Sequence, residues 1–151
     1  MQRIAVIGSL LKKIYRLYSQ ELLVSLQERG FLDLRPSFLE ILTFVCEVDS
    51  PSIKEIGHAC GLKKQTMTSH LNELERRGYI LRQKGLRDKR EQNVILTEYG
   101  EKFKVSLLEV IADLEGKYMN MIGDVEFDRV THTLENFFTK INNNEDQQRL
   151  L

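Results

Sequence analysis

The sequence has few of the residues that mark several common classes of protein. It contains two cysteines, two prolines and no tryptophan among 151 residues. Cys46 and Cys60 are too few for a disulfide framework, and their spacing matches no zinc-binding pattern. The low proline count, together with nine glycines, argues against an all-β protein built from many tight turns. No uncharged apolar run approaches the ~20 residues that a membrane span needs.

Motifs for catalysis and secretion are also missing. The phosphate-loop, dinucleotide, zinc-protease and serine-hydrolase patterns do not occur, so an enzyme is the least supported class. His58, His70 and His132 are too scattered to form a metal site, and we expect neither a metal nor another cofactor. The first residues lack the small-residue cleavage site of a signal peptide. We therefore expect a cytoplasmic protein that does not enter a membrane.

Charge is balanced overall but unevenly distributed. The chain has 22 basic and 22 acidic side chains. Residues 61–92, however, carry nine basic and four acidic side chains, a net charge of +5. A local positive region on an otherwise acidic chain is typical of a compact surface that binds a polyanion, although a solvated charged face would have the same composition.

Apolar residues recur at helical spacing over most of the chain, and a mainly helical protein is expected. The pattern predicts helices at about 4–28, 37–48, 52–60, 64–77, 98–122 and 125–141. Two short segments rich in bulky apolar residues, 79–82 and 93–96, flank a charged loop and predict a β-hairpin. The expected fold class is therefore mainly α with a small hairpin.

The middle of the chain has the order helix, glycine-containing turn, helix and basic hairpin. This order predicts a winged helix-turn-helix, whose second helix fits the DNA major groove. Met67, Leu71 and Leu74 would face the core. The opposite face carries mostly short polar side chains that we expect to contact base edges, namely Lys64, Gln65, Thr66, Thr68, Ser69 and Asn72.

The hairpin would form a basic wing beside this helix. Its cations Arg87, Lys89 and Arg90 would reach a neighbouring narrow minor groove, whose potential attracts arginine. The other cations of the region are expected to contact phosphates, and these are Lys63, Arg76, Arg77 and Lys84. The alternative for Arg76 and Arg77 is that they stay solvated.

Two segments of the sequence resemble MarR-family transcriptional regulators. Residues 61–80, GLKKQTMTSHLNELERRGYI, resemble the recognition-helix segment of that family. Asp88-Lys89-Arg90, followed by VILTEYG at 94–100, is similar to its wing signature, D-x-R and then V-x-L-T-x-x-G. The resemblance extends more loosely over nearly the whole chain. It implies that Arg90 is the minor-groove arginine and that Asp88 is the wing carboxylate that orients it.

The resemblance also implies a homodimer whose two lobes bind double-stranded DNA at a near-palindromic operator, as a repressor. In many members a small aromatic or phenolic ligand, or cysteine oxidation, weakens DNA binding. Lys63 departs from the family pattern, because relatives usually have Ser or Thr at this helix cap. Loss of such a cap costs about 0.5–2 kcal/mol.

Wide apolar helices at both ends of the chain agree with dimerisation, because one short lobe cannot cover them. We expect N-terminal helices for dimerisation and support at 1–48, the DNA-binding lobe at 49–97, C-terminal dimerisation helices at 98–142 and a polar tail at 143–151. The alternative is that these helices pack together as a monomeric bundle.

Three further alternatives remain open. The aromatic side chains Tyr15, Tyr18, Phe38 and Phe44 would either line a ligand cavity or belong to the core. Cys46 and Cys60 would either switch the protein by oxidation or be inert, as buried thiols are. The third alternative is that the protein is a winged-helix adaptor or antirepressor that lacks DNA contacts. The Asp88-x-Arg90 motif and the +5 segment disfavour this alternative.

Overall fold

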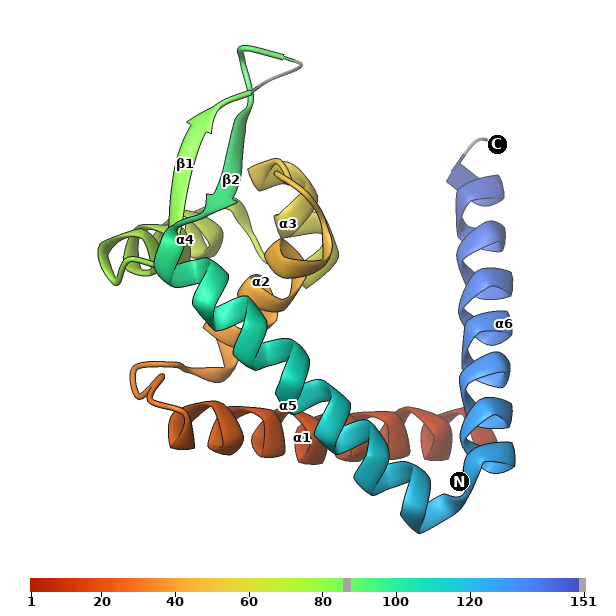
Figure 1. Ribbon diagram of the computed structural model, residues 1–151. Coiled ribbons are helices and arrows are strands. Elements are labelled where there is room, and N and C mark those ends of the chain that lie inside the picture. Colours follow the sequence, from red (N-terminus) through yellow and green to blue (C-terminus); the bar gives the residue numbers. More distant parts are fainter. Residues whose placement is uncertain (86–87, 150–151) are drawn as a thin grey trace. The chain divides into compact units, whose positions relative to one another are not determined.

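The computed structural model describes residues 1–85 and 88–149, which form six helices and one hairpin (Figure 1). The helices are α1 (Arg3–Glu28), α2 (Pro36–Glu47), α3 (Ile53–Cys60), α4 (Lys64–Arg76), α5 (Glu98–Ile122) and α6 (Asp124–Arg149). The strands are β1 (Ile80–Lys84) and β2 (Gln92–Leu96). The mainly helical fold with a small hairpin is thus confirmed. None of the described helices is long and apolar enough to cross a membrane.

The chain divides into two compact units, residues 1–111 and 112–151. The first contains α1 to α4, the hairpin and the start of α5, around one apolar core. Helix α2 lies within this core, because most of its side chains are apolar and five of them are buried. The expected segment boundaries at 48 and 97 do not coincide with the unit boundary, because the core joins α2 to the elements that follow it.

Local sequence signals set the start of α3 and the turn after it. The Ser52 hydroxyl accepts a hydrogen bond from the Glu55 backbone N–H at 3.0 Å, and the Glu55 carboxylate accepts one from the Ser52 N–H at 3.4 Å. This reciprocal pair is a capping box, which satisfies two backbone N–H groups at the start of the helix. Gly61 ends the helix in the left-handed conformation, with φ 63°. The chain can therefore reverse at once into α4.

The hairpin strands pair antiparallel, from Ile80 opposite Leu96 to Lys84 opposite Gln92. The Ser50–Ser52 segment lies beside β2, where the Val94 N–H donates to the Pro51 carbonyl at 2.9 Å. The Asn93 side-chain amide also donates to the Ser50 carbonyl at 2.6 Å. The loop before α3 therefore fixes the hairpin against the helix-turn-helix.

A buried tyrosine holds the end of α4 against the loop after α1. Tyr79 is fully buried, and its hydroxyl donates to the Asp33 carboxylate at 2.8 Å. Its ring packs against Phe31, Tyr99 and Phe103, with ring centroids 4.9–6.4 Å apart. Burial, followed by the hydrogen bond with Asp33, raises the pKa of Tyr79 well above its usual value. The phenol therefore stays neutral and keeps its proton for the hydrogen bond to Asp33.

The second unit contains the end of α5 and all of α6. The prediction that the last helix ends near 141 was wrong, because α6 continues to Arg149. Residues 142–149 contain no glycine or proline, and polar residues such as Glu, Gln and Arg support a helix without an apolar face. The earlier part of α6 exposes a row of apolar side chains, which are Val130, Leu134, Phe137, Phe138 and Ile141.

Helix α1 also exposes apolar side chains, along its first half. Leu22 and Leu26, near its end, are buried in the first unit. The exposed side chains are Ile4, Val6, Ile7, Leu10, Leu11, Ile14 and Leu17. Exposed apolar rows of this length are unusual on the surface of a monomer and mark surfaces that bind another protein.

Candidate nucleic-acid interface

Helix α4 separates its side chains into an inner and an outer face. Met67, Leu71 and Leu74 are buried, as their spacing predicts. The six side chains expected to contact base edges are all exposed, and these are Lys64, Gln65, Thr66, Thr68, Ser69 and Asn72. Thr68 donates its hydroxyl proton to the Lys64 carbonyl at 2.9 Å, so its oxygen lone pairs and methyl group are what it offers outward.

The start of α4 is open, as the departure at Lys63 predicts. Lys63 occupies the cap position and makes no side-chain hydrogen bond to the first turn. The first backbone N–H groups of the helix therefore lack a side-chain cap. Lys63 and Lys64 are exposed at the same end, so positive side chains and the positive end of the helix dipole coincide there.

The wing places its arginine in solvent beside an acidic residue. The Arg90 side chain is 93% exposed, and its Nε lies 3.5 Å from the Asp88 Oδ1. The same Asp88 oxygen accepts the Arg90 backbone N–H at 3.0 Å. Asp88 thus holds both the backbone and the side chain of Arg90. Lys84 and Lys89 are also exposed, while Arg87 lies outside the described residues.

Glycine is required at the tip of the hairpin. A Cβ atom on Gly85 would lie 2.1 Å from the Asp88 carbonyl oxygen, well inside van der Waals contact. The Gly85 N–H instead donates to the Glu91 carbonyl at 2.6 Å. This close approach closes the loop that presents Asp88 and Arg90, so the wing geometry depends on the missing side chain.

The two arginines that end α4 behave differently. Arg76 is exposed and pairs with Glu73 at 2.7 Å, and this hydrogen bond lowers the pKa of the Glu73 carboxyl. Arg77, expected to contact phosphate or to stay solvated, is instead mostly buried and already paired within the protein. Its side chain is 18% exposed, it lies over the Phe38 ring at 5.0 Å, and it donates to the Asp33 carbonyl. It therefore packs the end of α4 against the loop before α2.

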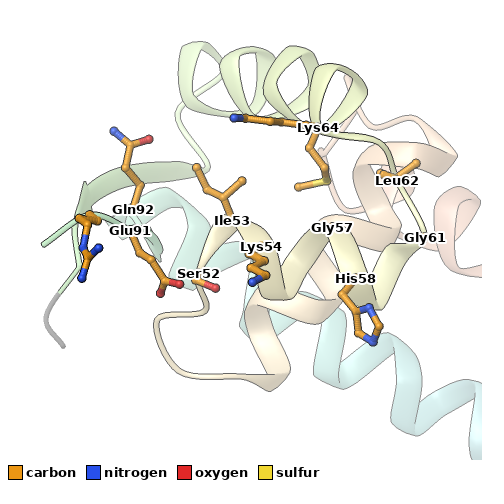
Figure 2. A pocket seen from close by; sticks show the side chains of 12 residues that line it. Ser52, Ile53, Lys54, Gly57, His58, Gly61, Leu62, Lys64, Glu91 and Gln92 are labelled. Carbon is orange, nitrogen blue, oxygen red and sulfur yellow. The ribbon is translucent and has the colours of Figure 1, made fainter. Parts of the chain in front are cut away.

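A broad hollow of about 970 Å³ lies between α3, the start of α4 and the wing. Figure 2 shows Lys54 on α3 and Lys64 on α4 at this hollow. Arg90 contributes a third cation, against the single acidic side chain of Glu91. Sequence reasoning did not select Lys54, because its position beside the wing depends on how α3 packs against the hairpin. The hollow and its cations suit a polyanionic backbone.

A smaller cavity of about 240 Å³ is lined by Tyr15, Tyr18 and Phe44. Phe38, the fourth aromatic residue expected there, does not line it. Its side chain is 1% exposed and packs edge-on against the His70 ring, with the ring centroids 5.3 Å apart. Phe38 is therefore part of the core. Cys60 also lines the cavity.

Both thiols have raised pKa values. Burial is the main cause in each case, and it raises the pKa of Cys46 to about 12 and that of Cys60 to about 11. Nearby carboxylates, Glu101 for Cys46 and Glu40 for Cys60, act in the same direction. Lys104 lowers the pKa of Cys46 but does not offset its burial. Since the thiolate is the form that oxidants attack, the raised pKa values disfavour oxidation of both cysteines.

Comparison with known proteins places this geometry in a family. The model of the MarR family matches residues 34–92, which extend from the residues before α2 to the start of β2. Residues 34–92 are a MarR-family domain. This MarR-family domain contains α4, the wing residue pair Asp88 and Arg90, and the loop that fixes the hairpin.

Relatives and solved structures agree with this assignment. The chain is 29% identical over 97 residues to the HTH-type transcriptional regulator SarZ of Staphylococcus aureus (strain MRSA252), a match that covers 64% of each chain. It therefore spans slightly less than two thirds of that relative. A MarR transcriptional regulator from Methanosarcina mazei Go1 is 20% identical with a TM-score of 0.76, over 90% of this chain and 96% of that one.

A third likeness concerns a regulator that was solved with a ligand. The PcaV transcriptional regulator from Streptomyces coelicolor, in complex with its natural ligand, is 16% identical with a TM-score of 0.66. The match covers 87% of this chain and 91% of PcaV. These structural matches show that the winged-helix fold of the MarR-family regulators extends beyond residues 34–92 over most of the chain.

Proposed function

We propose that this protein is a transcriptional regulator that binds double-stranded DNA at specific sequences. One observation carries the proposal: the polar outer face of α4 is exposed beside a wing whose Arg90 is held by Asp88 and is 93% exposed. Exposed hydrogen-bonding groups on a helix that fits the major groove, next to a solvated arginine on a hairpin, suit simultaneous contact with both grooves.

In this proposal α4 enters the major groove and the wing follows the adjacent minor groove. The side chains that face the bases are Lys64, Gln65, Thr66, Thr68, Ser69 and Asn72. On the wing, Lys89 and Arg90 contact the minor groove. Lys63, Arg76 and Lys84 contact phosphates, and Lys54 joins this set from α3. Arg77 leaves the set, because its guanidinium is already engaged with Asp33 and Phe38.

We further propose that the protein acts as a homodimer and represses transcription from a near-palindromic operator. The exposed apolar rows on α1 and α6 support a second copy as the partner, because each is too extensive for a monomer surface. Two identical lobes related by twofold symmetry read two half-sites in inverted order. A dimer bound to a promoter prevents the transcription machinery from binding the same DNA, and this is the proposed basis of repression.

A small aromatic effector is the proposed signal for release. Tyr15, Tyr18 and Phe44 line a cavity whose volume of about 240 Å³ suits a single-ring compound. The cavity lies between α1 and α2, so a ligand there would contact both the proposed dimerisation helix and the core that supports α4. PcaV, which shares this fold, was solved in complex with its natural ligand, and this supports a test for ligand binding by the present protein.

Gel-shift titration on the DNA upstream of the protein's own gene tests the proposal, at several salt concentrations. The regulator should give a shift that weakens steeply with salt and is stronger than that on random DNA. Absence of any salt-dependent shift would instead support the adaptor or antirepressor.

Light scattering of the wild type and of Leu10→Glu would test dimerisation, with Leu32→Glu, at another exposed leucine, as the control.

A further inference from the structure

An arginine on the wing strand reaches back to the recognition helix. Arg82 lies in the middle of β1, opposite Val94 of β2. Val94 is fully buried, so this position belongs to the inner face of the hairpin, and the Arg82 side chain is only 23% exposed. Its aliphatic stem is therefore covered, while its guanidinium emerges at α4.

The guanidinium bridges two side chains that stand one helical turn apart on α4. The Arg82 Nη2 donates to the Asn72 Oδ1 at 2.6 Å, and the Arg82 Nε donates to a Glu75 carboxylate oxygen at 2.9 Å. The same carboxylate oxygen lies 2.7 Å from Nη2. Glu75 thus fixes the plane of the guanidinium, and the guanidinium in turn fixes the amide of Asn72.

This contact determines which groups Asn72 can offer to DNA. A guanidinium has only donors, so the amide atom that faces it must be the oxygen. The exposed side chain of Asn72 is then left with its NH₂ donors for a ligand. An asparagine that reads adenine bidentately needs its oxygen to accept from the base, and here one of the two lone pairs of that oxygen already accepts from a charged donor.

We infer that Arg82 is a positioning residue that sets the base preference of Asn72. Held in this way, Asn72 presents its NH₂ donors to an acceptor on a base edge, such as guanine N7 or O6, in preference to the bidentate adenine contact, because its oxygen is already turned toward Arg82. The inference rests on the proposed function, since it assigns a role within the α4 interface. It also gives the β1 strand a part in sequence recognition, beyond the phosphate and minor-groove contacts of the wing tip.

Selection of bound duplexes from random DNA, followed by affinity measurements on single-base variants, tests this role. We compare the wild type, Asn72→Ala, Arg82→Met and Arg82→Lys. Asn72→Ala and Arg82→Met should both lose the preference at the same position of each half-site, by at least about 5-fold. The double variant should lose no more than either single one. Arg82→Lys keeps a charged donor and should retain part of the preference.

Arg76→Met is the matched control, because Arg76 also pairs with a glutamate on α4 and the variant loses the same charge. It should weaken binding to all sequences about equally and leave the selected motif unchanged. Thermal melting establishes that each variant is folded, and Glu75→Gln provides a second way to release Asn72 without changing β1.

The possible outcomes separate the two proposals. If the wild type selects no motif, the proposed function fails and the role of Arg82 fails with it. If the wild type selects a motif that Arg82→Met and Glu75→Gln both leave unchanged, only the inference about Arg82 is overturned. A uniform loss in Arg82→Met with a reduced salt dependence would likewise overturn it, because Arg82 would then be a phosphate contact.

Discussion

The Thr97 hydroxyl accepts a hydrogen bond from the Gly100 backbone N–H at 3.0 Å and thereby caps the start of α5. The same hydroxyl donates to the Gly78 carbonyl, at the end of α4. The Thr97 N–H also donates to the Tyr79 carbonyl at 3.1 Å. One residue thus joins the recognition helix, the hairpin and α5.

Gly100→Ala should destabilise the protein. An added Cβ would lie 2.1 Å from the Tyr79 carbonyl oxygen, a backbone atom that cannot move alone. We expect a loss of about 1–3 kcal/mol in the free energy of unfolding, measured by denaturant titration. Gly116→Ala, in the same helix but with nothing within 4 Å, should instead stabilise by about 0.5–1 kcal/mol. Equal effects of the two substitutions would contradict the proposed crowding at Gly100.

Ser52→Ala should weaken the start of α3. The substitution removes the acceptor for the Glu55 N–H, at a residue that is 3% exposed. We expect a loss of about 0.5–2 kcal/mol in the free energy of unfolding. Ser9→Ala, at an exposed position within α1, serves as the control and should change stability by less than about 0.5 kcal/mol.

Arg90→Ala should weaken DNA binding and flatten its salt dependence. Because the side chain is 93% exposed, its removal should leave the fold intact. The slope of log affinity against log salt should fall by about one for each bound subunit. Arg129→Ala removes an exposed arginine on α6, paired with Glu126, and should leave both affinity and slope unchanged. An unaltered slope in Arg90→Ala would refute the wing assignment.

Thr68→Ala should reduce sequence discrimination, and Ser69→Ala should act in the same way. Both residues are exposed on the outer face of α4. We expect affinity for the selected operator to fall by about 1 kcal/mol while affinity for random DNA stays the same. Thr131→Ala is a matched control, because Thr131 is exposed on α6 and, like Thr68, donates to the carbonyl four residues earlier. Equal losses on both DNAs would count against base contact.

Peroxide should not release the protein from DNA near pH 7. With pKa values of about 12 for Cys46 and about 11 for Cys60, few thiolates are present at neutral pH. Because both pKa values are raised above 9.0 in the folded state, the unfolded chain loses its thiol protons first. Stability should therefore be unaffected below about pH 9 and fall as pH rises toward 12.

Alkylation kinetics and urea unfolding across this pH range check the prediction, with Cys46→Ser and Cys60→Ser assigning each contribution. Rapid release by peroxide that either substitution blocks would support the oxidation switch instead.

Periodicity and turn chemistry predicted most of the elements because these signals are local. The stripe of Met67, Leu71 and Leu74 located α4 and its buried face. The end of α6 was missed, because a polar helix carries no periodic apolar signal. The sequence left the place of Phe38 open for a related reason, since an aromatic residue at helical spacing looks the same whether it faces a cavity or the core.

Some features of the candidate site also follow from the local sequence, while others depend on tertiary packing. Exposure of the outer face of α4 follows from its own sequence, since each residue's face is set by helical geometry. The difference in exposure between Arg76 and Arg77 does not follow from the sequence, because it arises only when α4 packs on the α1–α2 loop. Lys54 at the hollow likewise has no sequence signal.

The amino-acid sequence by itself determined which segments are helical, which faces are apolar and where positive charge concentrates, because each of these depends on neighbours within a few residues. Only the tertiary structure decided that Arg82 meets Asn72 and Glu75 and that Thr97 joins three elements. Such contacts arise when the hairpin folds back onto α4, and the distance between their partners is set by packing of the whole core.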